Sequence, residues 1–208
     1  MTVQVALLVH EESQEQEVFG PKYVAEAFGW AVDVVGPGKC GVVSVCKGKY
    51  GIPIKCDKTF EHVAGDEEDY DVVVISGGWG AERLRQDKDV LAFVRAMHAA
   101  GKVVAAICHG PWVLCSTAIT DGEFIPAKGL TKVLDGHCDQ AKIDGKPIPI
   151  WRRRKMTCYR GMKDDLIAAG AEYVDTPVVT DGNVVTAPHY DQVPQFMQAI
   201  RDLVEKRR

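Results

Sequence analysis

The sequence lacks the features that mark several large protein classes. It has no apolar run long enough to cross a bilayer, and its start lacks the basic region and small-residue cleavage site of an export signal. It contains no Cys-x-x-Cys pair, so no zinc site of that kind is predicted. Neither sign of charge dominates, since 25 basic and 29 acidic residues leave a net charge of -4. We therefore expect no membrane or nucleic-acid partner.

The cysteines are odd in number and irregularly spaced. Seven cysteines in a chain without an export pattern favour free thiols in a reducing, cytoplasmic setting. His137 and Cys138 are adjacent, and adjacent residues rarely ligate one metal ion together. We expect no metal and no cofactor. The basic cluster at 152–155 and the basic end at 206–208 are short and are interpreted as solvated.

What the chain does contain is enough apolar sequence for one full core. With 208 residues, 46% of them hydrophobic, it predicts one α/β domain spanning 1–208. Apolar strand patterns alternate with helical patterns, which favours βαβ units and a mostly parallel sheet. The predicted strands are Val3–Val9, Ala31–Val35, Asp71–Ser76 and Val103–Ile107. A Gly/Pro-rich stretch at about 121–155 has weak periodicity and is interpreted as an inserted lid or arm.

Cys108 stands where the fully apolar strand Val103–Ile107 ends and a helical pattern begins. Pro111 fits the first turn of that helix, so the cysteine occupies a tight strand-to-helix turn. Such a turn presents a side chain rigidly to a crevice, as the nucleophile elbow of hydrolases does. The helix N-terminus also favours a thiolate. The alternative is a small buried hydrophobic residue with no chemical role.

A second loop supports the catalytic interpretation. Gly77 and Gly78 follow the strand that precedes the Cys108 strand, and the ends of neighbouring parallel strands meet at one crevice. The backbone N–H groups of Gly78 and His109 are therefore candidates for an oxyanion hole. Without the cysteine turn, a tight turn with no ligand would be the favoured interpretation of these glycines.

These motifs resemble those of the ThiJ/PfpI superfamily, which includes PfpI intracellular proteases and amidases, deglycases and class III glyoxalases. The resemblance rests on four segments, Ser76–Arg85, Ala106–Pro111, Tyr159–Asp165 and Val179–Thr186, and fails mainly between Phe124 and Arg152. It implies a single domain related to class I glutamine amidotransferases. The implied fold is a flavodoxin-like three-layer α/β/α sandwich whose nucleophile elbow carries a cofactor-independent cysteine.

The resemblance also implies roles for individual residues. In the branch with histidine after the cysteine, a glutamate from a neighbouring subunit completes a Cys-His-Glu triad, which here would be Cys108, His109 and Glu82. A homo-oligomer, at least a dimer, is then expected. The family usually places a glutamate beside the cysteine sulfur, in the loop after the first strand. Alignment on Glu17 and Pro21 puts Gln14 there, whereas a shifted loop would bring Glu12 or Glu15 to the sulfur.

Three functions remain open from the sequence. The first is a hydrolase, hydratase or lyase in which Cys108 attacks a small electrophilic carbonyl or amide substrate. Glu12, Gln14, Trp79 and Trp112 are the residues expected to shape its pocket. The second is a redox or stress sensor whose thiol is oxidised without turnover. The third is a holdase chaperone in which the elbow has no catalytic role.

Overall fold

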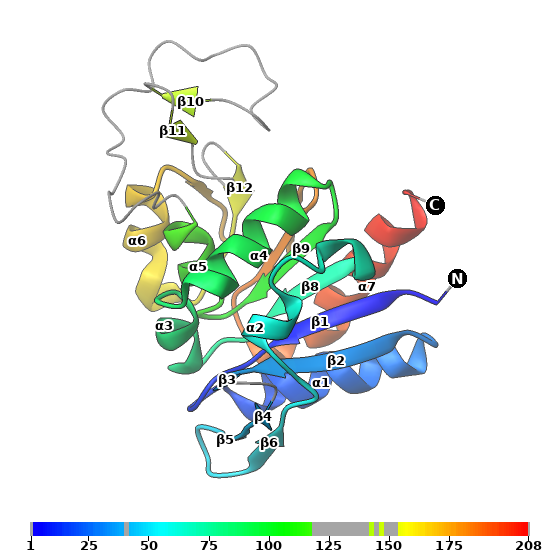
Figure 1. Cartoon of the computed structure of the whole chain (residues 1–208). Helices are drawn as coiled ribbons and strands as arrows, with labels where there is room; N and C mark the ends of the chain where they lie inside the picture. The colour runs from blue at the N-terminus through cyan, green and yellow to red at the C-terminus, as the bar shows by residue number, and fades with distance from the viewer. Residues whose placement is uncertain (1, 40–41, 118–141, 144–145, 148–153, 208) are drawn as a thin grey trace.

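The computed structural model describes residues 2–39, 42–117, 142–143, 146–147 and 154–207 (Figure 1). Among these residues no helix is both long and apolar enough to span a membrane. Most of the predicted insertion at 121–155, with His137 and Cys138, lies outside the described residues. Its described part includes the antiparallel strands β10 (Lys142–Ile143) and β11 (Lys146–Pro147).

The fold is organised on a seven-stranded sheet with the order β14-β15-β9-β8-β1-β2-β7. All neighbours pair in parallel except β14, which is antiparallel to β15. The mostly parallel α/β fold predicted from the sequence is thus confirmed. The strands are β1 (Gln4–Leu8), β2 (Ala31–Gly36), β7 (Lys58–Thr59), β8 (Val72–Ile75), β9 (Val103–Ile107), β14 (Val179–Asp181) and β15 (Val184–Ala187).

Helices cover both faces of the sheet, because its central strands are apolar on both faces. Val73 and Ile75 of β8 pack into one core, whereas Val72 and Val74 pack into the other. The first core is closed by α2 (Phe60–Val63), α3 (Gly80–Leu84), α4 (Lys88–Ala99), α5 (Pro111–Ser116) and α6 (Lys163–Ala168). The second is closed by α1 (Glu15–Ala27) and α7 (Val193–Glu205). The result is a three-layer sandwich.

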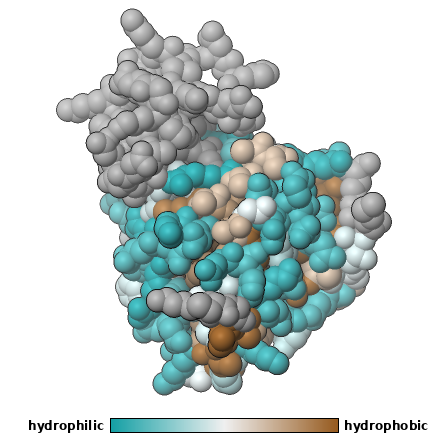
Figure 2. Space-filling model, in the orientation of Figure 1, coloured by the Kyte–Doolittle hydropathy of each residue, from teal (hydrophilic) through white to brown (hydrophobic). Residues whose placement is uncertain are grey.

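Short elements surround this sandwich. The irregular region after β2 forms two antiparallel pairs, β3 (Gly38–Lys39) with β4 (Val42–Val43) and β5 (Val45–Lys47) with β6 (Pro53–Lys55). This region therefore forms two short hairpins outside the main sheet. The remaining elements are η1 (Glu67–Asp69), β12 (Lys155–Met156), η3 (Arg160–Met162), β13 (Glu172–Tyr173) and η4 (Tyr190–Gln192). The surface seen in Figure 2 is mostly hydrophilic, with a small hydrophobic patch near its lower edge.

Candidate active site

Cys108 lies at the predicted strand-to-helix turn. It follows β9 directly and adopts φ 61°, a left-handed conformation that L residues other than glycine rarely take. Its amide donates to the Ala187 carbonyl at 2.8 Å, and its carbonyl accepts from the Tyr159 amide at 2.9 Å. Pro111 is the first residue of α5. The turn is strained and held from both sides, as a nucleophile elbow requires.

Glu17 is the carboxylic acid next to the Cys108 thiol, and the two side chains are hydrogen-bonded to each other. Its Oε2 accepts the Gly77 amide at 3.0 Å. Its Oε1 is buried and has no hydrogen-bond partner among the described residues. Burial raises the pKa of Glu17 to about 8, although its hydrogen bonds to Cys108 and Gly77 lower it. At neutral pH this side chain is therefore mostly a neutral acid.

The sequence-based expectation of a glutamine beside the sulfur is wrong. Residues 14 and 17 lie one helical turn apart, and it is Glu17 that reaches the thiol. Gln14 lines the neighbouring cavity, where its Nε2 donates to Gln16 Oε1 at 2.6 Å.

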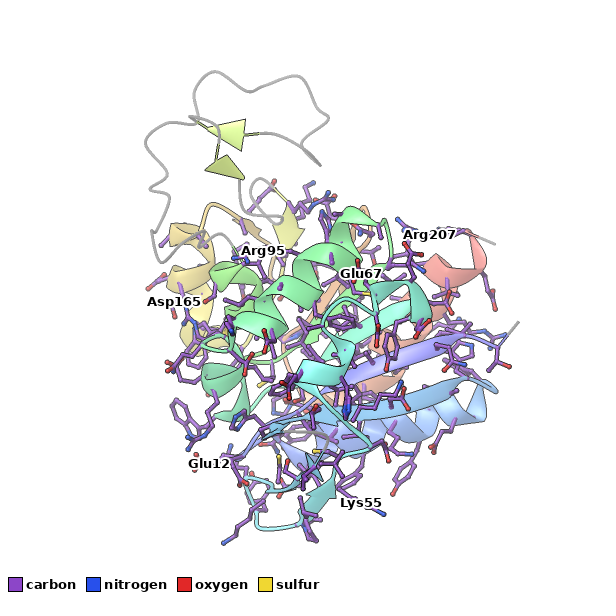
Figure 3. All side chains as sticks on the ribbon, in the orientation of Figure 1. Glu12, Lys55, Glu67, Arg95, Asp165 and Arg207 are labelled. Carbon is purple, nitrogen blue, oxygen red and sulfur yellow. The ribbon has the colours of Figure 1, made fainter. Side chains whose placement is uncertain are left out.

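Neither alternative glutamate takes this position. Glu12 is at the molecular surface (Figure 3) and pairs with Arg83 at 2.9 Å. Glu15 accepts the backbone N–H of Tyr50 at 2.7 Å. Chemistry that requires a carboxyl group beside the cysteine is therefore available to this protein.

Two glycines bring the ends of β8 and β9 together. A Cβ atom on Gly77 would lie 2.8 Å from Cys108 Cβ and 2.9 Å from the His109 amide nitrogen. Gly78 has φ 72°, and a Cβ there would lie 2.5 Å from the Glu12 carbonyl oxygen. This close approach lets the backbone N–H groups of Gly78 and His109 both donate to the Cys108 sulfur. The structure thus brings together the residues proposed for the oxyanion hole.

The protonation of Cys108 depends on that of Glu17. Burial raises the pKa of the Cys108 thiol, and a charged Glu17 raises it further by repulsion and hydrogen bonding. When Glu17 holds the proton, the repulsion disappears and its O–H becomes a donor to the sulfur. The amides of Gly78 and His109 lower the pKa in either state. The titrations of the two groups are therefore linked, and a neutral Glu17 favours the Cys108 thiolate more than a charged Glu17 does.

His109 contacts both the thiol and an aromatic cluster. Its Nδ1 lies 3.1 Å from Cys108 Sγ. Its ring centroid lies 4.6 Å from that of Tyr159, 5.0 Å from that of Trp112 and 5.9 Å from that of Trp79. Burial, followed by the charge of Lys49, lowers the pKa of His109, so the ring is neutral at neutral pH. A neutral imidazole at this distance is suited to exchanging a proton with the sulfur.

Glu82 contacts different partners within the chain. It lies on α3, where its carboxylate is 3.7 Å from Arg85 Nη1 and accepts from Gln86 Nε2 at 3.2 Å. It is absent from the described residues that line the Cys108 cavity. Trp112 is also outside that lining, but it contacts His109 and donates to Asp165 at 3.0 Å.

A cavity of about 330 Å³ opens above the Cys108 thiol. This is the size of a small-molecule site. Sequence reasoning found its Gln14, Gly78, Trp79, Cys108 and His109 but missed the others, which come from distant segments. Those are Glu17, Lys49, Tyr50, Tyr159, His189 and Tyr190. Among the described residues there is no cluster of three or more His, Cys, Asp or Glu side chains arranged to hold a metal ion.

Comparison with known proteins shows the family to which the chain is similar. The DJ-1/PfpI family model matches residues 3–128 and 148–203. The deglycase PfpI of Pyrococcus furiosus is 30% identical over 98% of this chain and 100% of its own. YraA of Bacillus subtilis, which carries a provisional cysteine-protease name, is 29% identical over 99% of this chain and 100% of its own.

The solved structures agree on the fold. A ThiJ/PfpI domain protein from Brachyspira murdochii superposes with a TM-score of 0.77 at 20% identity, over 99% of this chain and 98% of its own. The family match covers helix α1, which carries Glu17, and the turns after β8 and β9, which carry Gly78 and Cys108. The chain therefore belongs to the DJ-1/PfpI family.

Proposed function

We propose that this protein is a cofactor-independent enzyme in which Cys108 attacks a small electrophilic carbonyl compound. The observation that carries the proposal is the pairing of Cys108, at φ 61°, with the buried acid Glu17. A relative named as a deglycase, aligned over nearly the whole chain, supports activity on a carbonyl compound or its adducts. The cavity volume of about 330 Å³ suits a small substrate better than a folded protein.

The same geometry supports a sequence of steps for a 2-oxoaldehyde. The Cys108 thiolate bonds to the aldehyde carbon, and the carbonyl electron pair moves to oxygen, where the Gly78 and His109 amides stabilise the charge. Glu17 gives its proton to that oxygen and becomes a carboxylate. It then takes the proton from the same carbon, and the ketone oxygen is protonated to give an enediol. A proton is delivered to the adjacent carbon as the first oxygen loses its proton, which forms a thioester. Water hydrolyses the resulting thioester, which releases a 2-hydroxy acid and restores the thiol.

A second reaction, amide hydrolysis, is favoured by one specific contact. His109 Nδ1 lies 3.1 Å from Cys108 Sγ, the arrangement with which a Cys–His pair protonates a leaving amine. Variants of Glu17 and His109 distinguish the two reactions. Loss of Glu17 should abolish turnover of 2-oxoaldehydes, whereas loss of His109 should affect amide hydrolysis more strongly.

We also propose that the active protein is a homo-oligomer in which Glu82 orients His109 of a neighbouring subunit. The exposed aromatic side chains Trp79 and Tyr159 beside His109 support a covered site. Light scattering at micromolar concentration tests the assembly. A strictly monomeric protein with full turnover, or a Glu82→Gln variant with unchanged kcat, would remove Glu82 from the mechanism.

The experiment that tests the proposed function is a turnover screen of the wild type and a Cys108→Ala variant with 2-oxoaldehydes and small amides. We expect the variant to lose at least about a thousandfold in kcat/KM, since a covalent step has no substitute in the site. Cys115→Ala is the matched control. A sensor would be consumed stoichiometrically, and a holdase would keep its activity in Cys108→Ala.

A further inference from the structure

The tip of the β5–β6 hairpin enters the cavity above Cys108. Lys49 and Tyr50 lie in this turn, between Lys47 and Pro53, and both line the cavity. They are about sixty residues from the elbow in sequence, so their position depends on tertiary contacts. Neither residue takes part in the proposed steps, which use only the nucleophile, the acid and the oxyanion hole.

A network of hydrogen bonds holds this turn against the loop after β1. The Lys49 amide donates to the Ser13 carbonyl at 3.0 Å, and the Glu12 amide donates to the Lys47 carbonyl at 2.8 Å. The buried Glu15 carboxylate accepts from the amides of Tyr50 at 2.7 Å and Ile52 at 3.3 Å. These hydrogen bonds fix the backbone of the turn, so the Lys49 side chain starts from a defined position at the edge of the cavity.

The polar groups of the cavity favour a negative ligand. Lys49 contributes a positive charge and has no acidic partner among the described residues. The cavity carboxyl, Glu17, is mostly neutral at neutral pH. Tyr50, Tyr159 and Tyr190 add hydroxyl groups that can donate to an anion.

His189 lines the same cavity, and its Nδ1 contacts Asp191 at 3.0 Å. The Lys49 charge acts on both Glu17 and His109, which places the ammonium group close to the reacting centre.

We infer that Lys49 is a specificity residue that binds an anionic group, a carboxylate or a phosphate, on a small carbonyl substrate attacked by Cys108. This inference rests on the proposed nucleophile and adds the substrate class. The substrate would place its carbonyl at the Gly78 and His109 amides and its anionic end at the hairpin tip.

The test compares two alkylating reagents of nearly equal size, iodoacetate and iodoacetamide, which differ in charge. The measured quantity is the ratio of their second-order rate constants at Cys108, obtained by peptide mapping at pH 7.5 and low salt. We expect Lys49→Met to lower the iodoacetate-to-iodoacetamide ratio by about fivefold, the effect of one partly solvated charge. Lys49→Arg should restore the ratio, and 0.5 M NaCl should reduce the difference.

The matched control is Lys55→Met, on β6 of the same hairpin. Lys55 is exposed and lies outside the cavity lining (Figure 3). Its replacement should leave the ratio unchanged. An equal ratio in wild type and Lys49→Met, with rapid reaction of Cys108 toward iodoacetamide, would overturn the anion site and leave the nucleophile intact. A wild-type Cys108 that reacts with neither reagent would overturn both proposals.

Protection experiments identify the anionic group. Glycolate and inorganic phosphate are each titrated against iodoacetamide alkylation of the wild type and of Lys49→Met. Stronger Lys49-dependent protection by glycolate assigns a carboxylate substrate, and stronger protection by phosphate assigns a phosphorylated one. Protection by neither anion would contradict the proposal.

Discussion

Cys108 and two cysteines of the first core, Cys115 and Cys158, are buried to a similar degree but differ in their partners. Cys108 is 6% exposed, Cys115 on α5 is 7% exposed, and Cys158 is fully buried. Burial raises the pKa of all three thiols, and it raises that of Cys115 and Cys158 to about 12. Around Cys108 the backbone is strained, two amides donate to the sulfur, and an acid with a pKa of about 8 lies alongside. We therefore expect the groups around each thiol, and not its burial alone, to decide which of these cysteines reacts.

The largest effect on this difference is expected from removing the titratable carboxyl group beside Cys108. Glu17→Gln keeps a hydrogen-bond donor beside the sulfur but cannot take up or release a proton. We expect kcat for a 2-oxoaldehyde to fall by about 10²–10⁴, the usual contribution of a general acid or base. Alkylation of Cys108 should persist in the same variant. Steady-state kinetics and peptide mapping measure the two effects separately, and full turnover in Glu17→Gln would remove the acid from the mechanism.

The raised pKa of Glu17 should also appear in the pH dependence of stability. The folded chain holds a proton up to about pH 8, whereas the unfolded chain releases it near 4.5. The stability that Glu17 contributes is thus present below about pH 4.5 and lost as the pH rises towards 8.

The stability of the Glu17→Gln variant should not fall in this way as the pH rises, because glutamine does not titrate. The variant should therefore gain on the order of 2–4 kcal/mol relative to wild type between pH 5 and 8.5. Urea unfolding at three pH values measures it, with Glu82→Gln as the exposed control. A difference between Glu17→Gln and wild type that does not vary with pH would contradict the assignment.

A smaller effect on stability and on Cys108 alkylation is expected from adding a methyl group at Gly77, between the ends of β8 and β9. In Gly77→Ala the new methyl group would contact Cys108 Cβ and the His109 amide, and it would also meet the Glu17 carboxylate. We expect a loss of about 1–3 kcal/mol in the free energy of unfolding, the usual cost of overpacking. Alkylation of Cys108 should slow, while Cys115 should be unaffected. Retained stability together with wild-type Cys108 alkylation would show that this close approach is not required.

The fold was predictable because the sequence of each central strand shows by itself that the strand is buried on both faces. The runs at 72–75 and 103–107 are apolar without interruption, which is typical of strands covered on both faces. The turn at Cys108 was predictable for the same reason, since Pro111 marks the first residue of the next helix. These features depend on neighbours in sequence, so sequence patterns suffice to find them.

The rest of the site depends on contacts between distant segments. Gln14 and Glu17 are equally compatible with the start of a helix. Only the packing of α1 against the sheet determines which of them contacts the Cys108 sulfur. Lys49 reaches the cavity because Glu15 binds the backbone of its turn, and no local pattern signals that contact. The role of Glu82 depends on a second chain and stays a prediction.

The pH dependence of Cys108 alkylation by iodoacetamide tests the central claim most directly. Rates are followed by intact mass and peptide mapping from pH 5 to 10, with Cys115 and Cys158 as internal references. The account predicts that Cys108 reacts at neutral pH at least about tenfold faster than either reference, because the Gly78 and His109 amides and a neutral Glu17 stabilise its thiolate against the effect of burial. A Cys108 that reacts no faster than Cys115 and Cys158 would contradict it.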